Sequence, residues 1–288
     1  GKGNDQVRFE LGYYALKPEI KIIAPWREWD LSSRSKLIEY AEKNQIPVPR
    51  DKRGEPPFSQ DANLLHISSE GKLLEDPWEE PPEDIFAWTC SVKDSPDEPV
   101  YLEIGFEQGV PVHLDGELLE GERLIAYLNT VAGQHGIGRI EHLENRLVGI
   151  KSREVYEAPA AVVLHIAHRA LEAMTLSKEQ QRFREQIGQE YADLVYNGQW
   201  FSPYREDLHA FVTSCQRYVS GIVRVKLHKG NCSVVGRKSP RSLYSYRLAT
   251  YEEDDDFDAS AATGFIHIYG LPLKNQAQIQ TGLDKPKD

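Results

Sequence analysis

The pattern of hydrophobic and polar positions predicts two helices and one strand in the first 50 residues. Before Pro18, apolar residues recur at the spacing of an amphipathic helix, which Asn4 could cap: Val7, Leu11 and Tyr14. Residues 20–23 include three isoleucines and predict a buried strand. Residues 33–44 predict a second helix with three buried residues, Leu37, Ile38 and Ala41. A helix, a strand and a helix in this order are typical of an α/β layer.

The next 65 or so residues change from an irregular to an alternating pattern. Residues 50–99 show no clear period and are rich in proline and acidic residues, so we interpret them as a solvated connecting loop. Residues 102–106 and 110–114 then alternate between apolar and polar positions. This alternation predicts a β-hairpin that turns at Gly109.

The following segment is mainly helical. The pattern predicts a helix over residues 124–131, a strand over residues 143–150 and a long apolar helix over residues 160–173. Ser177 and Gln180 have the spacing of a capping box, which predicts the start of a further helix.

The last third of the chain combines a helix, a hairpin and a tail. Residues 205–218 predict a helix, and residues 223–228 and 232–235 predict the two strands of a hairpin that turns on residues 230–231. Residues beyond Leu273 are polar, which indicates a C-terminal tail that is frayed or used in assembly.

Length and composition indicate a globular protein of about two domains. The chain has 288 residues, of which 40% are hydrophobic and 10% aromatic, and this composition predicts a soluble globular protein and excludes disorder. No apolar run approaches the roughly 18 residues that a transmembrane helix needs. The net charge of -11 has the wrong sign for nonspecific binding to nucleic acid or to an anionic membrane.

The methionine and cysteine residues add one expectation about the extent of the protein and one about its cellular location. The single methionine is Met174, so Gly1 is not a translation start, and we expect these residues to be an interior or C-terminal part of a longer protein. The three cysteines, Cys90, Cys215 and Cys232, have no C-x-x-C spacing, which argues against a disulfide framework or a zinc site. A reducing cytoplasm is the expected location.

The first ten residues, GKGNDQVRFE, are the most specific candidate site. Glycines that lead into a helix leave backbone N–H groups free at its positive end, where phosphate or carboxylate oxygens are stabilised. Asn4 and Arg8 lie on one face of that helix with Asp5 beside them, so a donor, a cation and an acid converge there. A glycine-rich turn before a capped surface helix would give the same pattern.

Charged residues also gather between positions 144 and 157, next to apolar Leu147, Val148 and Ile150. Because charged side chains are seldom buried unless they are paired, these residues either line a cleft or pair with one another. Both alternatives remain open from the sequence.

Two other constellations favour a structural role. His165 and His168 lie three residues apart on an apolar helix without a matching carboxylate or cysteine, so we interpret them as core or interface histidines and not as metal ligands. The acidic run at residues 252–256 lacks the glycine and terminal glutamate of a calcium loop and is interpreted as a solvated loop.

Several motifs in matching order resemble the argininosuccinate synthase family. They are GKGNDQVRFE at 1–10, IAPWR at 23–27, HIS at 66–68, ENR at 144–146, KSR at 151–153 followed by Tyr156 and Glu157, SPRSLY at 239–244 and ATGFI at 262–266. The resemblance runs from Gly1 to about Leu273. It implies an α/β fold in which the remainder of a Rossmann-like nucleotide-binding domain (1–46) precedes an α+β synthetase and oligomerisation domain (47–272) and a C-terminal tail (273–288).

The implied activity is an ATP-dependent ligation of citrulline and aspartate to argininosuccinate, a step of arginine biosynthesis. ATP adenylylates the ureido oxygen of citrulline, and the aspartate amine then displaces AMP at the ureido carbon. Such a reaction depends mainly on the positioning of charged groups. The resemblance further implies a cytoplasmic homotetramer and Mg²⁺ bound with ATP, with no metal ligand supplied by the chain itself.

The resemblance also assigns site residues. Asn4 would contact both amino acids and Asp5 would bind aspartate, while five residues would bind citrulline: Arg8, Ser59, Ser68, Glu144 and Tyr156. Asp5 and Arg8 are the expected catalytic residues, and Gly1, Lys2 and Gly3 are expected at ATP. Glu144 could pair with the α-ammonium group of citrulline, because a carboxylate accepts charge-assisted hydrogen bonds.

The family's Ser-Gly-Gly-x-Asp-x-Ser pyrophosphate loop is not in this sequence. We therefore expect the longer parent protein to be active and these 288 residues alone to be inactive. The alternative is a truncated, inactive substrate-binding or assembly module of the same family.

Overall fold

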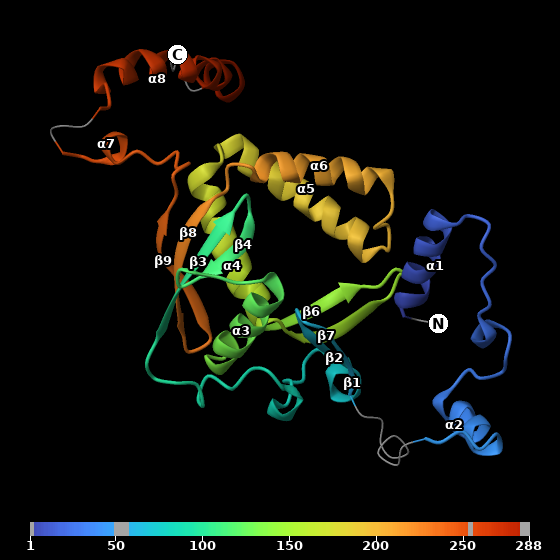
Figure 1. Cartoon of the computed structure of the whole chain (residues 1–288). Helices are drawn as coiled ribbons and strands as arrows, with labels where there is room; N and C mark the ends of the chain where they lie inside the picture. The colour runs from blue at the N-terminus through green and yellow to red at the C-terminus, as the bar shows by residue number, and fades with distance from the viewer. Residues whose placement is uncertain (1–2, 49–57, 253–255, 283–288) are drawn as a thin grey trace. The chain divides into compact units, whose positions relative to one another are not determined.

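The computed structural model describes residues 3–48, 58–252 and 256–282 (Figure 1). The chain divides into two compact units, residues 1–243 and residues 244–288. The described part of the first unit is a mixed α/β structure with two antiparallel sheets. The second unit is helical where it is described.

The first segment contains the helices α1 (Asp5–Leu16) and α2 (Arg34–Lys43) with the 3₁₀ turn η1 (Pro25–Arg27) between them. Both predicted helices are confirmed. The strand predicted at residues 20–23 is wrong: these residues have no partner strand, and Ile23 is 79% exposed. The face predicted for α2 is also partly wrong, because Ala41 is buried whereas Leu37 is 51% exposed.

A four-stranded sheet carries the candidate site. It comprises β1 (Ser59–Ala62), β2 (Ile67–Glu70), β6 (Arg139–Asn145) and β7 (Lys151–Glu157), in the order β1-β2-β7-β6. The interpretation of residues 50–99 as loop is therefore wrong where β1 and β2 pair, and two 3₁₀ turns follow them, η3 (Lys72–Glu75) and η4 (Glu83–Ile85).

The single strand predicted over residues 143–150 is a hairpin. Asn145 pairs with Lys151, and the Arg146 N–H donates to the Ile150 carbonyl at 2.8 Å across the turn. Gly149 has a φ of 83°, a value that glycine adopts without strain. The charged residues 144–153 therefore surround a turn and do not lie along one strand.

The second sheet has five strands in the order β5-β4-β3-β8-β9. Their bounds are β3 (Val100–Glu107), β4 (Val110–Leu114), β5 (Glu117–Leu118), β8 (Gly221–His228) and β9 (Asn231–Lys238). The hairpin predicted at Gly109 is confirmed. The other hairpin turns on Lys229 and Gly230, one residue earlier than predicted, because both have a positive φ and His228 pairs with Asn231.

Four helices complete the first unit: α3 (Gly121–Gln134), α4 (Pro159–Thr175), α5 (Lys178–Tyr196) and α6 (Pro203–Gln216). The capping box at Ser177 and Gln180 is confirmed, and α5 and α6 run side by side (Figure 1). α3 and α4 pack on the five-stranded sheet, and the core between them is built from buried aliphatic residues such as Ile104, Leu128, Val163, Leu171 and Val223.

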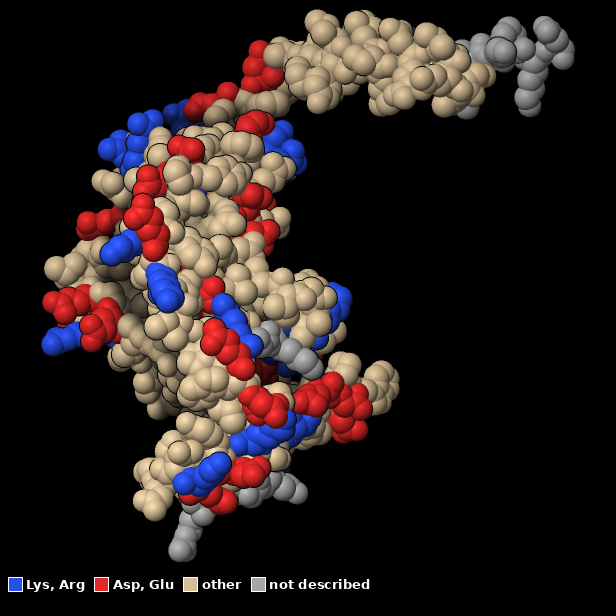
Figure 2. Space-filling model, turned by 90° about the vertical axis from the view of Figure 1, so that its right-hand side faces the viewer, with Lys and Arg blue, Asp and Glu red and all other residues tan. Residues whose placement is uncertain are grey.

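The second unit contains α7 (Tyr246–Ala249), α8 (Ala259–Gln276) and a π-helical turn (Ala277–Thr281). Residues 274–281 continue the helix and are not frayed. None of the helices in the described part of the chain is long and apolar enough to cross a membrane. On the face drawn in Figure 2, acidic and basic side chains are interspersed.

Candidate functional site

One face of the four-stranded sheet carries most of the candidate site. Residues directly opposite in antiparallel strands point to the same face. Tyr156 of β7 lies opposite Ser68 of β2 and opposite Ile140 of β6. Glu144 follows Ile140 by four residues on β6, so it is on this face too. The other face carries Ile67 and Val155, which are buried, so alternation separates a core face from a polar face.

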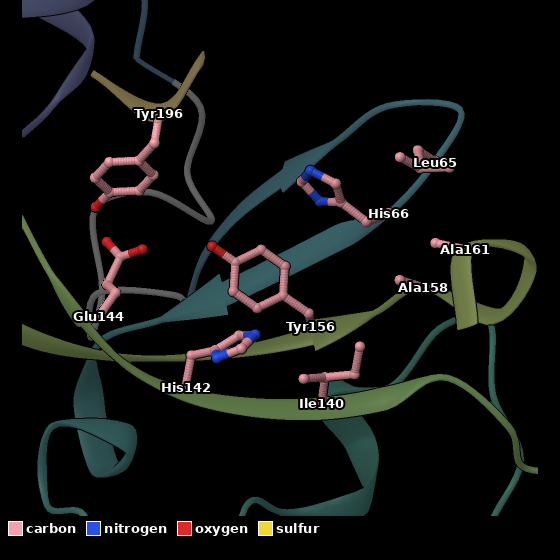
Figure 3. Close-up of a pocket in the computed structure, with 9 residues that line it drawn as sticks. All are labelled: Leu65, His66, Ile140, His142, Glu144, Tyr156, Ala158, Ala161 and Tyr196. Carbon is pink, nitrogen blue, oxygen red and sulfur yellow. The ribbon is translucent and has the colours of Figure 1, made fainter. Parts of the chain in front are cut away.

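The polar face forms the floor of a pocket of about 390 Å³. In Figure 3, Glu144 and Tyr196 lie at one end and Leu65, Ala158 and Ala161 at the other. His66, Tyr156, His142 and Ile140 lie between the two ends. The pocket therefore has a polar end and an apolar end, as a site for an amphipathic small molecule requires.

The start of α1 is tied to the polar end of this pocket. Asn4 stands at the N-cap position, but its side chain does not cap the helix as predicted. Its Oδ1 instead accepts from the Leu147 N–H at 2.9 Å, and its Nδ2 donates to the Tyr196 hydroxyl at 2.8 Å. The Arg8 Nε donates to the Tyr196 carbonyl at 2.7 Å, and its guanidinium lies over the Tyr196 ring. Tyr196 thus connects Asn4 and Arg8 to the pocket, which Glu144 and Tyr156 also line.

The polar end presents mainly hydrogen-bond acceptors. Tyr156 donates its hydroxyl proton to Glu154 at 2.9 Å, which leaves the Tyr156 oxygen to accept from a ligand. Burial raises the pKa of Tyr156 above its ordinary value and the bond to Glu154 raises it further, so the phenol stays protonated at neutral pH. With Glu144 close by, this end suits a cationic donor such as an ammonium group.

Arg146 holds the carboxylates around it. Its guanidinium pairs with Glu70 and, at 3.3 Å, with Glu154, while its Nε donates to the Ser152 hydroxyl at 2.8 Å. Glu144 is more distant, 3.8 Å from Nε. Burial raises the pKa values of Glu70 and Glu154, although Arg146 opposes this shift. Both alternatives left open by the sequence therefore hold: part of the charge cluster pairs internally, and Glu144 lines the pocket.

Glu157 has a different environment from its neighbour Tyr156, because it points to the core face. Its buried carboxylate accepts four hydrogen bonds of 2.7–2.8 Å, from the N–H groups of residues 87, 88 and 89 and from the Thr89 hydroxyl. The Tyr-Glu pair thus combines a pocket residue with a structural anchor.

The structure brings together five of the predicted substrate residues and leaves two apart. Glu144 and Tyr156 line the pocket, Asn4 and Arg8 are bonded to Tyr196, which also lines it, and Ser68 lies opposite Tyr156 on the same face of the sheet. Ser59 lines a neighbouring cavity of about 730 Å³ that it shares with Arg146 and Ser152. Asp5 is exposed and pairs with Arg8 at 3.4 Å.

Gly3 is exposed just before α1. Gly1 and Lys2, the other residues predicted at ATP, lie outside the described residues, as does part of the acidic run 252–256.

Sequence reasoning did not single out Tyr196, His142, Glu70 or Glu154. His142 and Glu154 share the face of Tyr156 by strand alternation, a signal that becomes readable only when residues 139–157 are recognised as a hairpin. Tyr196 ends α5, 192 residues after Asn4, and no local pattern indicates their contact.

Within residues 3–48, 58–252 and 256–282, no three His, Cys, Asp or Glu side chains come together in a way that could hold a metal ion. The His168 Nε2 hydrogen-bonds with Gln216 at 2.9 Å and its ring packs on Phe106, in line with the structural interpretation of this histidine.

Comparison with known proteins identifies the family. Residues 58–276 match the family described as Arginosuccinate synthase C-terminal domain, and residues 1–47 match the Arginosuccinate synthase N-terminal HUP domain. The chain belongs to the argininosuccinate synthase family. The resemblance found in the sequence motifs is thereby confirmed.

Individual relatives agree with this assignment. Over its full length the chain is 57% identical to the argininosuccinate synthase of Dehalococcoides mccartyi strain CBDB1 and covers 70% of that protein. Over 97% of its length it is 57% identical to the enzyme of Symbiobacterium thermophilum, of which it covers 69%. Over 95% of its length it is 54% identical to that of Rhodospirillum centenum, of which it covers 68%. These matches do not favour the alternative of an inactive module.

Proposed function

We propose that the protein joins citrulline to aspartate at the expense of ATP, releasing AMP and pyrophosphate. The observation that carries this proposal is that Glu144 and Tyr156, two residues that the family resemblance assigns to citrulline, line one pocket. Asn4 and Arg8, assigned to the same substrates, are bonded to the Tyr196 wall of that pocket. Membership of a family of ATP-dependent ligases supports the reaction type.

The acceptor character of the pocket supports a specific role for its polar end. Glu144 would offset the α-ammonium group of citrulline, and the Tyr156 oxygen would accept one of its N–H groups. Arg8 and the Ser68 hydroxyl are donors for carboxylate or ureido oxygens. Fixed in this way, the ureido oxygen would attack the α-phosphate of ATP with release of pyrophosphate, and the aspartate amine would then displace AMP at the ureido carbon.

ATP is the co-substrate in this proposal. Gly1, Lys2 and Gly3 lead into α1, whose N-terminal N–H groups and dipole favour phosphate or carboxylate oxygens. Asp5, in the first turn, would bind the aspartate substrate. Mg²⁺ would be bound with the ATP phosphates. In this view residues 1–46 belong to a Rossmann-like nucleotide-binding domain, 47–272 to the synthetase domain and 273–288 to a tail.

We further propose that the protein is a cytoplasmic homotetramer. Helix α8 supports assembly because it exposes large apolar side chains that an interface would cover, among them Phe265, Ile268 and Tyr269. Static light scattering on the purified protein is expected to give about four times the chain mass. A monomer at micromolar concentration would contradict the assembly without affecting the proposed reaction.

The proposed reaction is tested by pyrophosphate release. The full-length protein is incubated with ATP, citrulline and aspartate, and the pyrophosphate formed is measured, with each amino acid omitted in turn as a control. Release that requires citrulline, with argininosuccinate as the product, is the expected result. Citrulline binding measured by calorimetry on the same protein separates the two parts of the proposal. A protein that neither binds citrulline nor releases pyrophosphate in its presence contradicts the proposed function.

A further inference from the structure

Tyr156 stands between two histidine rings that no part of the proposed reaction uses. The His66 ring meets the Tyr156 ring edge-on, with centroids 5.3 Å apart and planes at 68°. The His142 ring does the same at 5.6 Å and 77°. Figure 3 shows the two histidines on either side of the tyrosine, with all three rings lining the pocket.

The three rings come from three different positions in the chain. Tyr156 is on β7, His142 is on the edge strand β6, diagonally across from it, and His66 directly precedes β2. Diagonal neighbours on one sheet face are within reach of aromatic side chains, so the sheet register itself brings His142 to Tyr156. The ring arrangement therefore depends on the fold and not on local sequence.

The backbone register of the sheet fixes the Cα position of Tyr156, but it does not fix the position of the hydroxyl group. Rotation about the first side-chain bond would move the hydroxyl by several bond lengths, because the whole ring turns with it. In the structure the hydroxyl donates to Glu154, and the ring is in contact with the two histidine rings. Edge-to-face pairs have a preferred geometry, so two of them at roughly opposite sides hold the ring in one orientation.

The bonding of His66 agrees with a packing role for its ring. Its Nε2 lies 3.3 Å from the Asn63 amide nitrogen, which makes Nε2 the acceptor of that bond and Nδ1 the protonated nitrogen. Nδ1 is buried and has no hydrogen-bond partner among the described residues. An unpaired buried donor costs free energy. A hydrogen bond of Nδ1 therefore does not explain the position of this ring, whereas its contact with the Tyr156 ring does.

We propose that His66 and His142 are positioning residues that clamp the Tyr156 ring and so fix its hydroxyl oxygen as a hydrogen-bond acceptor for citrulline. This inference rests on the proposed function, because it concerns the same pocket. Loss of one ring pair would leave Tyr156 present but less often in the binding orientation. Ground-state binding of citrulline would weaken, and the chemical step in the filled site would be nearly unchanged.

The main test compares ring-deleting with ring-retaining variants at position 142. His142→Leu and His142→Phe both remove the polar imidazole, but only His142→Phe keeps a ring. For His142→Leu and His66→Ala we expect the citrulline KM to rise about fivefold, with kcat within about twofold of wild type. For His142→Phe we expect a citrulline KM close to that of wild type.

A second measurement asks whether the effect passes through Tyr156. In a Tyr156→Phe background the hydroxyl is absent, so His142→Leu should raise the citrulline KM no further than Tyr156→Phe alone. His209 serves as a control, because its ring contacts a tyrosine ring, that of Tyr191, with centroids 6.2 Å apart and a tilted geometry, but lies on α6. His209→Ala should leave the citrulline KM unchanged.

Three outcomes would overturn the clamp. One is a wild-type citrulline KM in both His142→Leu and His66→Ala. Another is an equal rise in the citrulline KM of His142→Phe and of His142→Leu. A third is that His142→Leu raises the citrulline KM in the Tyr156→Phe background as much as it does in wild type. Melting temperatures of all variants identify any that are unfolded. Failure of the proposed function is distinguishable, because wild type itself would then show no citrulline-dependent pyrophosphate release.

Discussion

Glu144 is the residue at which binding and structure can be separated most cleanly. Its side chain is 15% exposed and borders the pocket, and its distance to Arg146 is 3.8 Å. Arg146 has closer partners than Glu144, namely Glu70, Glu154 and Ser152. The Glu144 carboxylate accepts from the Ser152 hydroxyl at 3.4 Å and also borders the pocket, where a ligand can reach it.

We expect Glu144→Gln to weaken citrulline binding and to leave the fold intact. Loss of a charge-assisted hydrogen bond costs about 1.5 to 3 kcal/mol, which corresponds to a roughly ten- to hundredfold higher citrulline KM. Steady-state kinetics with varied citrulline measure this, and a thermal melt of the same variant serves as the control. A lowered melting temperature with unchanged citrulline dependence would instead assign Glu144 a purely structural role.

Glu157 is expected to behave in the opposite way. Its carboxylate is 3% exposed and accepts from four donors, whereas a glutamine amide would turn an NH₂ group toward at least one of them, such as the Ala87 N–H. We expect Glu157→Gln to cost about 2 to 3 kcal/mol and to lower the melting temperature by roughly 5 to 10 °C, measured by calorimetry.

The matched control for this change is Glu141→Gln, on the neighbouring strand β6. Glu141 pairs with Arg153 at 2.9 Å, and its side chain is 48% exposed. Water can therefore solvate the substituted amide, and Arg153 keeps its bonds to the carbonyls of Asp76 and Glu79, so we expect a smaller loss of stability than at Glu157. Equal melting temperatures for the two variants would show that the four hydrogen bonds of Glu157 do not stabilise the fold.

At the residue scale, the sequence predicts which residues belong to the site better than it predicts which side chains contact one another. The family motifs led to Glu144 and Tyr156, and the structure places both in one pocket. The motifs gave no reason to separate Tyr156 from Glu157, because the opposite directions of adjacent strand residues matter only once a core face exists. Tyr196 carries no sequence signal, since its importance comes from its contacts with Asn4 and Arg8.

At the scale of elements, patterns with local causes were predicted well. The capping box of α5 and the hairpin at Gly109 depend on residues within one turn of each other, and both are confirmed. The strand predicted at residues 20–23 depended on hydrophobicity alone. A strand also needs a partner that supplies its hydrogen bonds, and a run of isoleucines cannot indicate whether one exists.

Asn129 joins three elements around the pocket. Its Nδ2 donates to the Leu64 carbonyl at 2.8 Å, in the β1–β2 loop, and its Oδ1 accepts from the Ala160 N–H at 2.9 Å, at the start of α4. Leu65 and Ala161, the next residues along, line the pocket. The Asn129 amide on α3 therefore fixes the spacing of the apolar end.

We expect Asn129→Asp to break one of these two bonds selectively. A carboxylate still accepts from Ala160 but faces the Leu64 carbonyl with an oxygen, and residue 129 is 8% exposed. Leaving a buried polar group unsatisfied costs about 1 to 3 kcal/mol, so a calorimetric scan should show a melting temperature lower by roughly 3 to 10 °C. Asn145→Asp is the control, because Asn145 is exposed and only accepts, from Lys151. Similar melting temperatures for both variants would exclude this role of Asn129.

At the scale of the molecule the candidate site depends on contacts between distant segments. The bonds of Asn4 to Leu147 and Tyr196 span 143 and 192 residues. Composition and periodicity describe neighbours along the chain and cannot report such contacts. Asn4 and Glu144 could be predicted for the same substrates only from the family resemblance, because members of one family share their folded arrangement.

The stability of the whole molecule should depend on pH through His135. This side chain is buried, and its Nδ1 has no hydrogen-bond partner within the described residues. Burial lowers the pKa of His135 below its ordinary value of 6.5, and the nearby His228 and Lys229 lower it further. The unfolded chain therefore binds this proton at higher pH than the folded protein. The stability that neutral His135 contributes is fully present above pH 6.5 and is lost as the pH falls below it.

Other buried groups contribute to the same pH range, so the prediction concerns a difference between two proteins. Burial also lowers the pKa of His168, which acts in the same direction, whereas the raised pKa values of Glu70 and Glu154 favour the folded state as the pH falls. These contributions are common to wild type and His135→Leu and cancel in the comparison. Urea unfolding at about pH 7.5 and about pH 5.5 should show a smaller loss of unfolding free energy for His135→Leu than for wild type. Equal losses in the two proteins would mean that His135 is protonated as readily in the folded state as in the unfolded chain.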